Sequence, residues 1–194
     1  MKRILILFIA LVLCTAPFVS CTVKPQHPAK TSIGMPYEAF VVCDNDAWSE
    51  GVDSVVYRTL GARVLGLPRP ESYFYVVDHK GPKQLTDMDR KYSNILSINL
   101  NASFSEPTLQ VEDNVYAYPQ TIVTLNAANA DVAKYYLEAY AGEICGLFEI
   151  GERNRSLAHS RRSSTPKLVE AFTNHLGIEM HIPAGFARAN SGDR

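Results

Sequence analysis

A strongly apolar stretch constrains the architecture of this chain more than any other feature. Residues 37–44 read Tyr-Glu-Ala-Phe-Val-Val-Cys-Asp, and a strand without polar alternation is typical of a parallel sheet covered on both faces. Asp44, Asn45 and Asp46 follow, and these residue types are preferred at helix N-termini. A helix is therefore expected over residues 47–60, weakened by Gly51. A buried strand that leads directly into a helix predicts a layered α/β domain.

Further strands are indicated by stretches rich in β-branched, aromatic and aliphatic residues. A loop is expected at residues 66–70 because of their prolines, and a hairpin turn at residues 112–114. The strands are expected at residues 72–78, 94–99, 108–111, 115–118, 121–125 and 178–182.

Two helices are indicated in the second half. From Asp131 onward, apolar residues recur at helical spacing past Ile150. Thr165 followed by Pro166 predicts the start of another helix, which Gly177 would end. The fold class is therefore α/β or α+β, a single layered domain with a mixed sheet and packed helices. It would occupy residues 36–186, and residues 187–194 would form a disordered tail.

The N-terminal segment is typical of an export signal. Met1-Lys2-Arg3 is positively charged, and an apolar run follows over residues 4–13. A membrane-spanning helix needs about 20 apolar residues, roughly twice the length of this run. A positive start, a short apolar core and small residues beyond it predict a secretory signal peptide over residues 1–20.

The cleavage region indicates a lipid anchor. Phe18-Val19-Ser20-Cys21 has the form of a bacterial lipobox, although Phe18 stands where Leu is usual. Cys21 is therefore the predicted lipid attachment site; ordinary signal cleavage nearby is the alternative. Residues 21–35 contain two of the three prolines at positions 25, 28 and 36, and they would form an extended, lipidated tether. The expected location is the cell envelope, on the periplasm-facing side of the inner or outer membrane.

The charge balance and the positions of the cysteines limit the classes of partner that this chain is expected to bind. The chain has 19 Lys and Arg against 20 Asp and Glu, which argues against a nucleic-acid partner. Cys43 and Cys145 lie in apolar stretches, which favours two buried thiols, while a disulfide between them stays an alternative in the periplasm. The membrane, through the N-terminal lipid, and an envelope protein or glycan are the expected partners.

Common catalytic signatures are missing from the sequence after the signal. There is no Gly-x-Ser-x-Gly, His-Glu-x-x-His, Walker or Gly-x-Gly-x-x-Gly motif. The histidines lack metal-ligand spacing, and no Cys-x-x-Cys pair occurs. The sequence therefore assigns no catalytic residue, no metal ligand and no cofactor.

Two groups of residues are candidates for a site. Asp44, Asp46 and Trp48 follow a predicted strand, and ligands of open α/β sheets bind beyond the carboxyl ends of strands. The alternative is that the aspartates cap the helix and Trp48 fills the core. The other candidate is a basic patch that could contact anionic head groups, formed by Arg153, Arg155, Arg161 and Arg162. Its alternative is a solvated helix end in which Arg153 pairs with Glu149.

Several short segments, taken in order, carry a resemblance. They are Gly34-Met35-Pro36-Tyr37, Val41-Val42-Cys43-Asp44 with Trp48, Leu67-Pro68-Arg69-Pro70-Glu71, Asn94-Ile95-Leu96, residues 115–120 and residues 177–183. With these the chain resembles an uncharacterised family of Bacteroidetes envelope lipoproteins, a domain of unknown function. The resemblance implies the lipid anchor and transfers no catalytic residue. Members of that family continue beyond residue 183 into an aromatic-rich region, so the resemblance implies a C-terminally truncated relative.

The expected function is that of a membrane-anchored lipoprotein whose domain binds a ligand or partner without catalysis. One alternative is an envelope hydrolase that acts on glycan or peptide through Asp44 and Asp46. Another is a degraded gene product with little function of its own.

Overall fold

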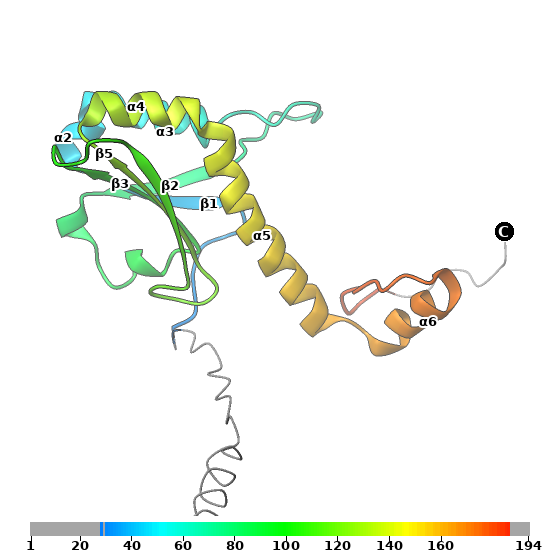
Figure 1. The fold of residues 1–194 in the computed structure, drawn as a ribbon. Helices are drawn as coiled ribbons and strands as arrows, with labels where there is room; N and C mark the ends of the chain where they lie inside the picture. Colours follow the sequence, from blue (N-terminus) through cyan, green and yellow to red (C-terminus); the bar gives the residue numbers. More distant parts are fainter. Residues whose placement is uncertain (1–27, 29, 187–194) are drawn as a thin grey trace, which may run out of the picture.

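A five-stranded sheet organises the molecule. The computed structural model describes residue 28 and residues 30–186, and Figure 1 shows the sheet with helices on one face. The strand order is β2-β1-β3-β5-β4. The strands are β1 (Glu38–Val42), β2 (Tyr75–Lys80), β3 (Asn94–Leu100), β4 (Thr108–Asp113) and β5 (Thr121–Ala127).

The sheet is mixed, as predicted. β1 pairs in parallel with β2 and β3, and β3 pairs in parallel with β5. Only β4 runs antiparallel, on the outer side of β5. Four of the five residues of β1 are buried, because the strand is central and both of its faces are covered. The prediction of a single α/β domain with a mixed sheet is confirmed.

One face of the sheet carries the larger core. The chain leaves β1 through α2 (Asn45–Ala47), a π turn (Trp48–Val52) and α3 (Asp53–Thr59). Gly51 has φ of 101°, which glycine adopts without strain, and it breaks the helix predicted over residues 47–60 at the expected place. α3, α4 (Ala130–Ala139) and the first half of α5 (Ala141–Ser163) cover this face.

The opposite face carries a smaller cluster, and no long helix of the described residues covers it. Phe40, Val42, Ile95 and Ile122 are buried there against Val77, Leu85 and Tyr92. The ring of Phe40 stacks on Tyr92 with centroids 5.0 Å apart. The cover is the connection between β2 and β3, which contains two 3₁₀ turns at Pro82–Gln84 and Asp89–Lys91.

The strand predicted at residues 115–118 is wrong. These residues form the loop of the β4–β5 hairpin, which contains a cis Tyr118–Pro119 bond. The buried side chain of Gln120 holds the loop: its amide donates to the carbonyls of Arg90 (2.7 Å) and Tyr92 (2.8 Å) and accepts from the N–H of Tyr116 (2.9 Å). A side chain thus supplies partners that a neighbouring strand would otherwise supply.

The C-terminal elements also differ from the prediction in part. The long helix expected from Asp131 is two helices, because the chain bends at Tyr140 between α4 and α5. Residues 178–182 form no strand; a single bridge joins Ser164 to Pro183. α6 (Pro166–Leu176) begins after Thr165 and ends at Gly177, as predicted. The second half of α5 leaves the sheet and carries α6 away from the body (Figure 1).

The N-terminal segment joins the body at the amino ends of the strands. The N–H of Tyr118 donates to the carbonyl of Lys30 (2.9 Å), and Ile33 exchanges backbone hydrogen bonds with Lys91 and Ser93 (2.9 Å each). The backbone of residues 30–33 is therefore part of the folded body. The predicted signal peptide, Cys21 and the predicted tail lie outside the described residues. Within the part of the chain that the structure describes, no helix is long and apolar enough to span a membrane.

Candidate functional site

A pocket of about 570 Å³ lies at the carboxyl edge of the sheet. It follows directly from the strand order, because β1 and β3 connect onward in opposite directions and leave a crevice beyond their ends. Strand ends and the segments after them supply its lining: Asp44, Asn45, Asp46, Ala47, Glu50, Gly81, Pro82, Lys83, Gln84, Leu100, Asn129 and Ala130.

The two predicted carboxylates both line this pocket. Asp44 precedes α2, but its side chain makes no cap hydrogen bond; only its carbonyl accepts, from the N–H of Trp48 at 2.9 Å. Asp46 is exposed and has no hydrogen-bond or ion-pair partner among the described residues. Both carboxylates are therefore available to a ligand.

Trp48 does not join them. Its indole stacks on the ring of His79, with centroids 4.0 Å apart and planes 2° apart. The Nε2 atom of His79 lies 2.9 Å from the carbonyl oxygen of Cys43, which holds the imidazole in place. Trp48 also packs edge-on against Tyr57 and against the larger core. The structure thus brings Asp44 and Asp46 together and assigns Trp48 to packing.

The wall after β2 is held by its own hydrogen bonds. The Oε1 atom of Gln84 accepts from the N–H of Gly81 (3.1 Å) and from the amide of Asn45 (3.3 Å). The ammonium group of Lys80 donates to both oxygens of Asp89 at 2.8 and 2.9 Å. Burial alone would raise the pKa of Asp89, but hydrogen bonds from Lys80 and Thr86 outweigh it and lower that pKa below its usual value.

Cys43 and Cys145 are free and buried. Burial raises the pKa of Cys43 to about 12, with a further contribution from the charge of Asp44, and burial raises that of Cys145 to about 11. Thiols with such pKa values are almost wholly protonated near neutral pH and are poor nucleophiles. They act as small core side chains. Among the described residues, no group of three or more His, Cys, Asp or Glu could hold a metal ion.

The amino edge of the sheet is closed by a buried ionic network. Glu152, on α5, is 6% exposed and forms an ion pair with the guanidinium of Arg155 (2.8 Å). It also accepts hydrogen bonds from the amide of Asn94 (2.8 Å) and the N–H of Tyr37 (3.0 Å). Arg155 also donates to Asn94 at 2.6 Å, and Asn94 to the carbonyl of Glu38 at 2.8 Å. The network joins α5 to the starts of β1 and β3.

The four arginines predicted as a basic patch therefore lie in different environments and do not form one patch. Arg155 is largely buried in the network. Arg153 forms the predicted i,i+4 ion pair with Glu149, with an Nε–Oε1 distance of 3.0 Å. Arg161 and Arg162 are exposed near the end of α5. Only these last two project as cations from the body.

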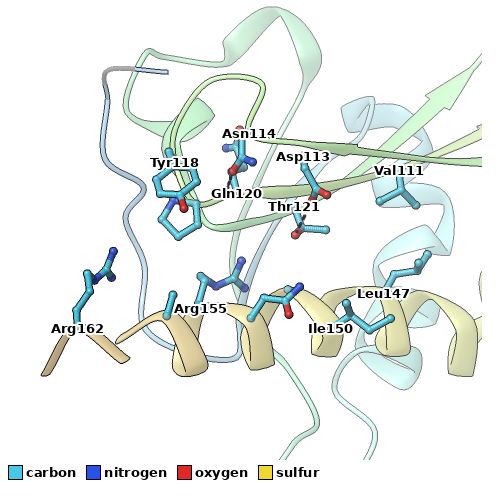
Figure 2. Close-up of a pocket in the computed structure, with 14 residues that line it drawn as sticks. Val111, Asp113, Asn114, Tyr118, Gln120, Thr121, Leu147, Ile150, Arg155 and Arg162 are labelled. Carbon is cyan, nitrogen blue, oxygen red and sulfur yellow. Dashed lines mark hydrogen bonds between the residues drawn. The ribbon is translucent and has the colours of Figure 1, made fainter. Parts of the chain in front are cut away.

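A second pocket, of about 330 Å³, lies between α5 and the β4–β5 hairpin (Figure 2). Its apolar end is formed by Val111, Leu147 and Ile150, and Arg162 and Tyr118 lie toward the other end. Gly151 allows α5 to approach closely here, because a Cβ atom at this position would lie 2.6 Å from Oγ1 of Thr121. Sequence reasoning missed this pocket, since its lining comes from segments that are distant in the chain.

Comparison with known families gives a match over most of the folded body. Residues 32–161 match a domain of unknown function, DUF8532, and the chain belongs to this family. The predicted membership of an uncharacterised family is thereby confirmed at that level. The match includes the whole sheet and both edges, and it ends near the end of α5. No curated protein and no solved structure matches the chain.

Proposed function

We propose that this chain is an envelope lipoprotein of the Bacteroidetes type, held in the membrane by lipid on Cys21, whose domain binds a ligand at the carboxyl-edge pocket without catalysis. The proposed envelope location rests on the positive start, the short apolar run and the Phe18–Cys21 sequence. The binding role rests on one observation: Asp44 and Asp46 line a pocket and are committed to no cap or ion pair.

The chemistry of the lining favours a neutral ligand rich in hydroxyl groups. Carboxylate oxygens at Asp44, Asp46 and Glu50 and amides at Asn45 and Gln84 surround the pocket, and such groups accept and donate hydrogen bonds to hydroxyls. Three acidic groups against Lys83 alone repel phosphates and other anions. A glycan of the cell envelope, or a neutral fragment of one, fits this lining.

The anchor is tested by replacing Cys21 with Ala. Wild-type protein should incorporate a radiolabelled fatty acid and sediment with membranes, whereas C21A should lose the label and its stable attachment, because two or more acyl chains are needed to hold a protein on a bilayer. If wild type incorporates no label, or if C21A sediments equally, the anchor is wrong.

The pocket is tested separately with soluble, uncharged glycan fragments, oligomers of N-acetylglucosamine, as the probe. Calorimetric titration should detect binding to wild type and a loss of at least about tenfold in affinity for D44N and D46N, since each variant removes a charged acceptor. Glu170→Gln on α6 is the matched control and should bind as wild type. Absence of binding, or equal binding by all variants, would contradict the glycan assignment.

A hydrolase is the second candidate, favoured by the same two carboxylates in one pocket, since a pair of carboxyl groups can serve as general acid and base. Incubation with the same fragments, followed by mass spectrometry, distinguishes the two readings. New reducing ends that disappear in D44N would establish hydrolysis of the glycan. Unchanged fragments alongside measurable binding would leave the non-catalytic role.

A further inference from the structure

The two edges of the sheet differ in how they meet solvent. β2, at one edge, ends in the charged run Asp78, His79 and Lys80, and its pairing with β1 shifts register at Ala39–Phe40. Charges and irregular pairing protect an edge strand from further pairing. β4, at the other edge, pairs regularly with β5 over its whole length and begins with the uncharged residues Thr-Leu-Gln-Val.

The backbone groups that β4 leaves free can be identified from the hairpin. The N–H of Asn114 donates to the carbonyl of Gln120 at 2.9 Å, and the N–H of Thr121 donates to Ser93, on the β3 side, at 2.8 Å. Asn114 and Gln120 therefore occupy a hydrogen-bonded position of the β4–β5 ladder. Hydrogen-bonded pairs alternate along an antiparallel ladder, and the next ones are Glu112–Ile122 and Gln110–Thr124. The N–H and C=O groups of Leu109, Val111 and Asp113 therefore point away from β5.

Two apolar side chains near these free groups, Val111 and Ile150, are exposed. Val111 is 45% and Ile150 59% exposed, and both line the pocket between β4 and α5 (Figure 2). Val111 shares the helix-covered face with Leu109, because their partners Val123 and Leu125 are buried in the larger core. A strand added beside β4 would cover the exposed side chains of Val111 and Ile150.

We propose that β4 pairs antiparallel with β4 of a second copy of this chain, across a two-fold axis at Val111. In this register each acidic residue faces an uncharged one: Glu112 lies opposite Gln110 of the other copy, and Asp113 opposite Leu109. Three hydrogen-bonded pairs form, with roughly six backbone hydrogen bonds. The two sheets become one, and the interface is isologous, so it closes at two copies.

Other symmetric registers are worse. An axis at Asp113 places two carboxylates opposite each other, which is destabilising. An axis at Glu112 does the same, because Glu112 then faces its own copy. An axis at Gln110 forms fewer hydrogen bonds, because Asp113 then lies opposite Pro107, which has no N–H. An axis at Leu109 pairs the strand with the loop before it. The second copy is therefore favoured over an unrelated peptide by this self-complementarity.

The register is tested by disulfide trapping of the full chain, purified in a mild detergent and treated with copper phenanthroline. In the proposed dimer the two Val111 Cα atoms lie about 5.5 Å apart, within the range of a disulfide. V111C should give a covalent dimer on a non-reducing gel. Thr108→Cys, also exposed on the same strand, would lie roughly 20 Å from its copy and should crosslink at least about tenfold less.

The backbone contribution is tested by sedimentation velocity over a concentration series. Val111→Pro removes an N–H that β5 does not use, so the fold should tolerate it, and the species of two copies should be lost. Val111→Thr keeps the N–H and should still associate. A single-copy mass for wild type, an undiminished dimer for V111P, or equal trapping at positions 108 and 111, as micelle-held chains would give, overturns the proposal.

Discussion

The two ends of the same parallel strands are built in opposite ways. At the amino edge, Glu152, Asn94 and Arg155 are buried and satisfy one another, and the entering chain is hydrogen-bonded alongside them. At the carboxyl edge, Asp44 and Asp46 stay exposed in a pocket. The difference separates stability from recognition. Substitutions at the amino edge should change the free energy of unfolding, and those at the carboxyl edge should change binding.

The largest expected effect is that of Glu152→Ala. It leaves Arg155 without its anionic partner and the N–H of Tyr37 without an acceptor, and removal of one partner from a buried ion pair costs about 3 to 5 kcal/mol. Urea denaturation measures the loss. Glu149→Ala, one turn earlier on α5 in a more exposed ion pair, should cost much less. Equal losses would show that the network is not what closes this edge.

Gly151→Ala should rank second. The new Cβ would lie 2.6 Å from Oγ1 of Thr121, and overpacking of this kind costs about 1 to 3 kcal/mol. Gly146→Ala is the matched control: it lies in the same helix with open space around the added atom, so it should raise stability by up to about 1 kcal/mol through helix propensity. Thr121→Ala combined with G151A should recover part of the loss. Thermal unfolding of the four proteins provides the comparison.

Asp89→Asn should alter the pH dependence of stability. The pKa of Asp89 is lowered in the folded state, so its ionised form contributes stability above the unfolded pKa of about 3.9. That contribution is lost as the pH falls through the folded pKa. The free energy of unfolding of wild type should therefore fall more steeply below about pH 4 than that of D89N. Parallel curves would contradict the role of the Lys80–Asp89 pair.

The smallest effect on stability is expected for Asp44→Ala and Asp46→Ala. Both side chains are exposed and without partners in the described structure, so the free energy of unfolding should stay within about 0.5 kcal/mol of wild type. Chemical denaturation checks this. A loss comparable to that of E152A would mean that the pocket is a structural element, and the contrast between the two edges would fail.

The parts of the fold that could be predicted are those with a local signal. The apolar run of β1 predicts a strand inside the sheet, and Thr165-Pro166 and Gly177 predict the two ends of α6. The amino-edge network carries no such signal, because Asn94 and Glu152 are 58 residues apart. Nothing near either residue in the sequence indicates that they meet.

Each misjudged feature has a tertiary cause. Residues 115–118 have strand-forming side chains, but the hydrogen bonds of the buried Gln120 side chain hold them in a loop. Arg155 has other charged residues as sequence neighbours, which suggested an exposed cation. In the structure it is largely buried, because it forms an ion pair with buried Glu152, one turn earlier on α5. Trp48 follows the predicted aspartates closely in the sequence, but its indole stacks on the ring of His79, which lies on β2.

The point at which the N-terminal segment meets the body has a consequence for orientation. Lys30 and Ile33 are fixed beside Tyr118 and Tyr92, where the strands begin, and strands of five to seven residues span roughly 20 Å. A chain held at Cys21 would thus turn the amino edge of its sheet, the edge with the Glu152 network, toward the bilayer. The crevice with Asp44 and Asp46 would look outward into the aqueous compartment, where dissolved or polymeric molecules could reach it unobstructed by head groups.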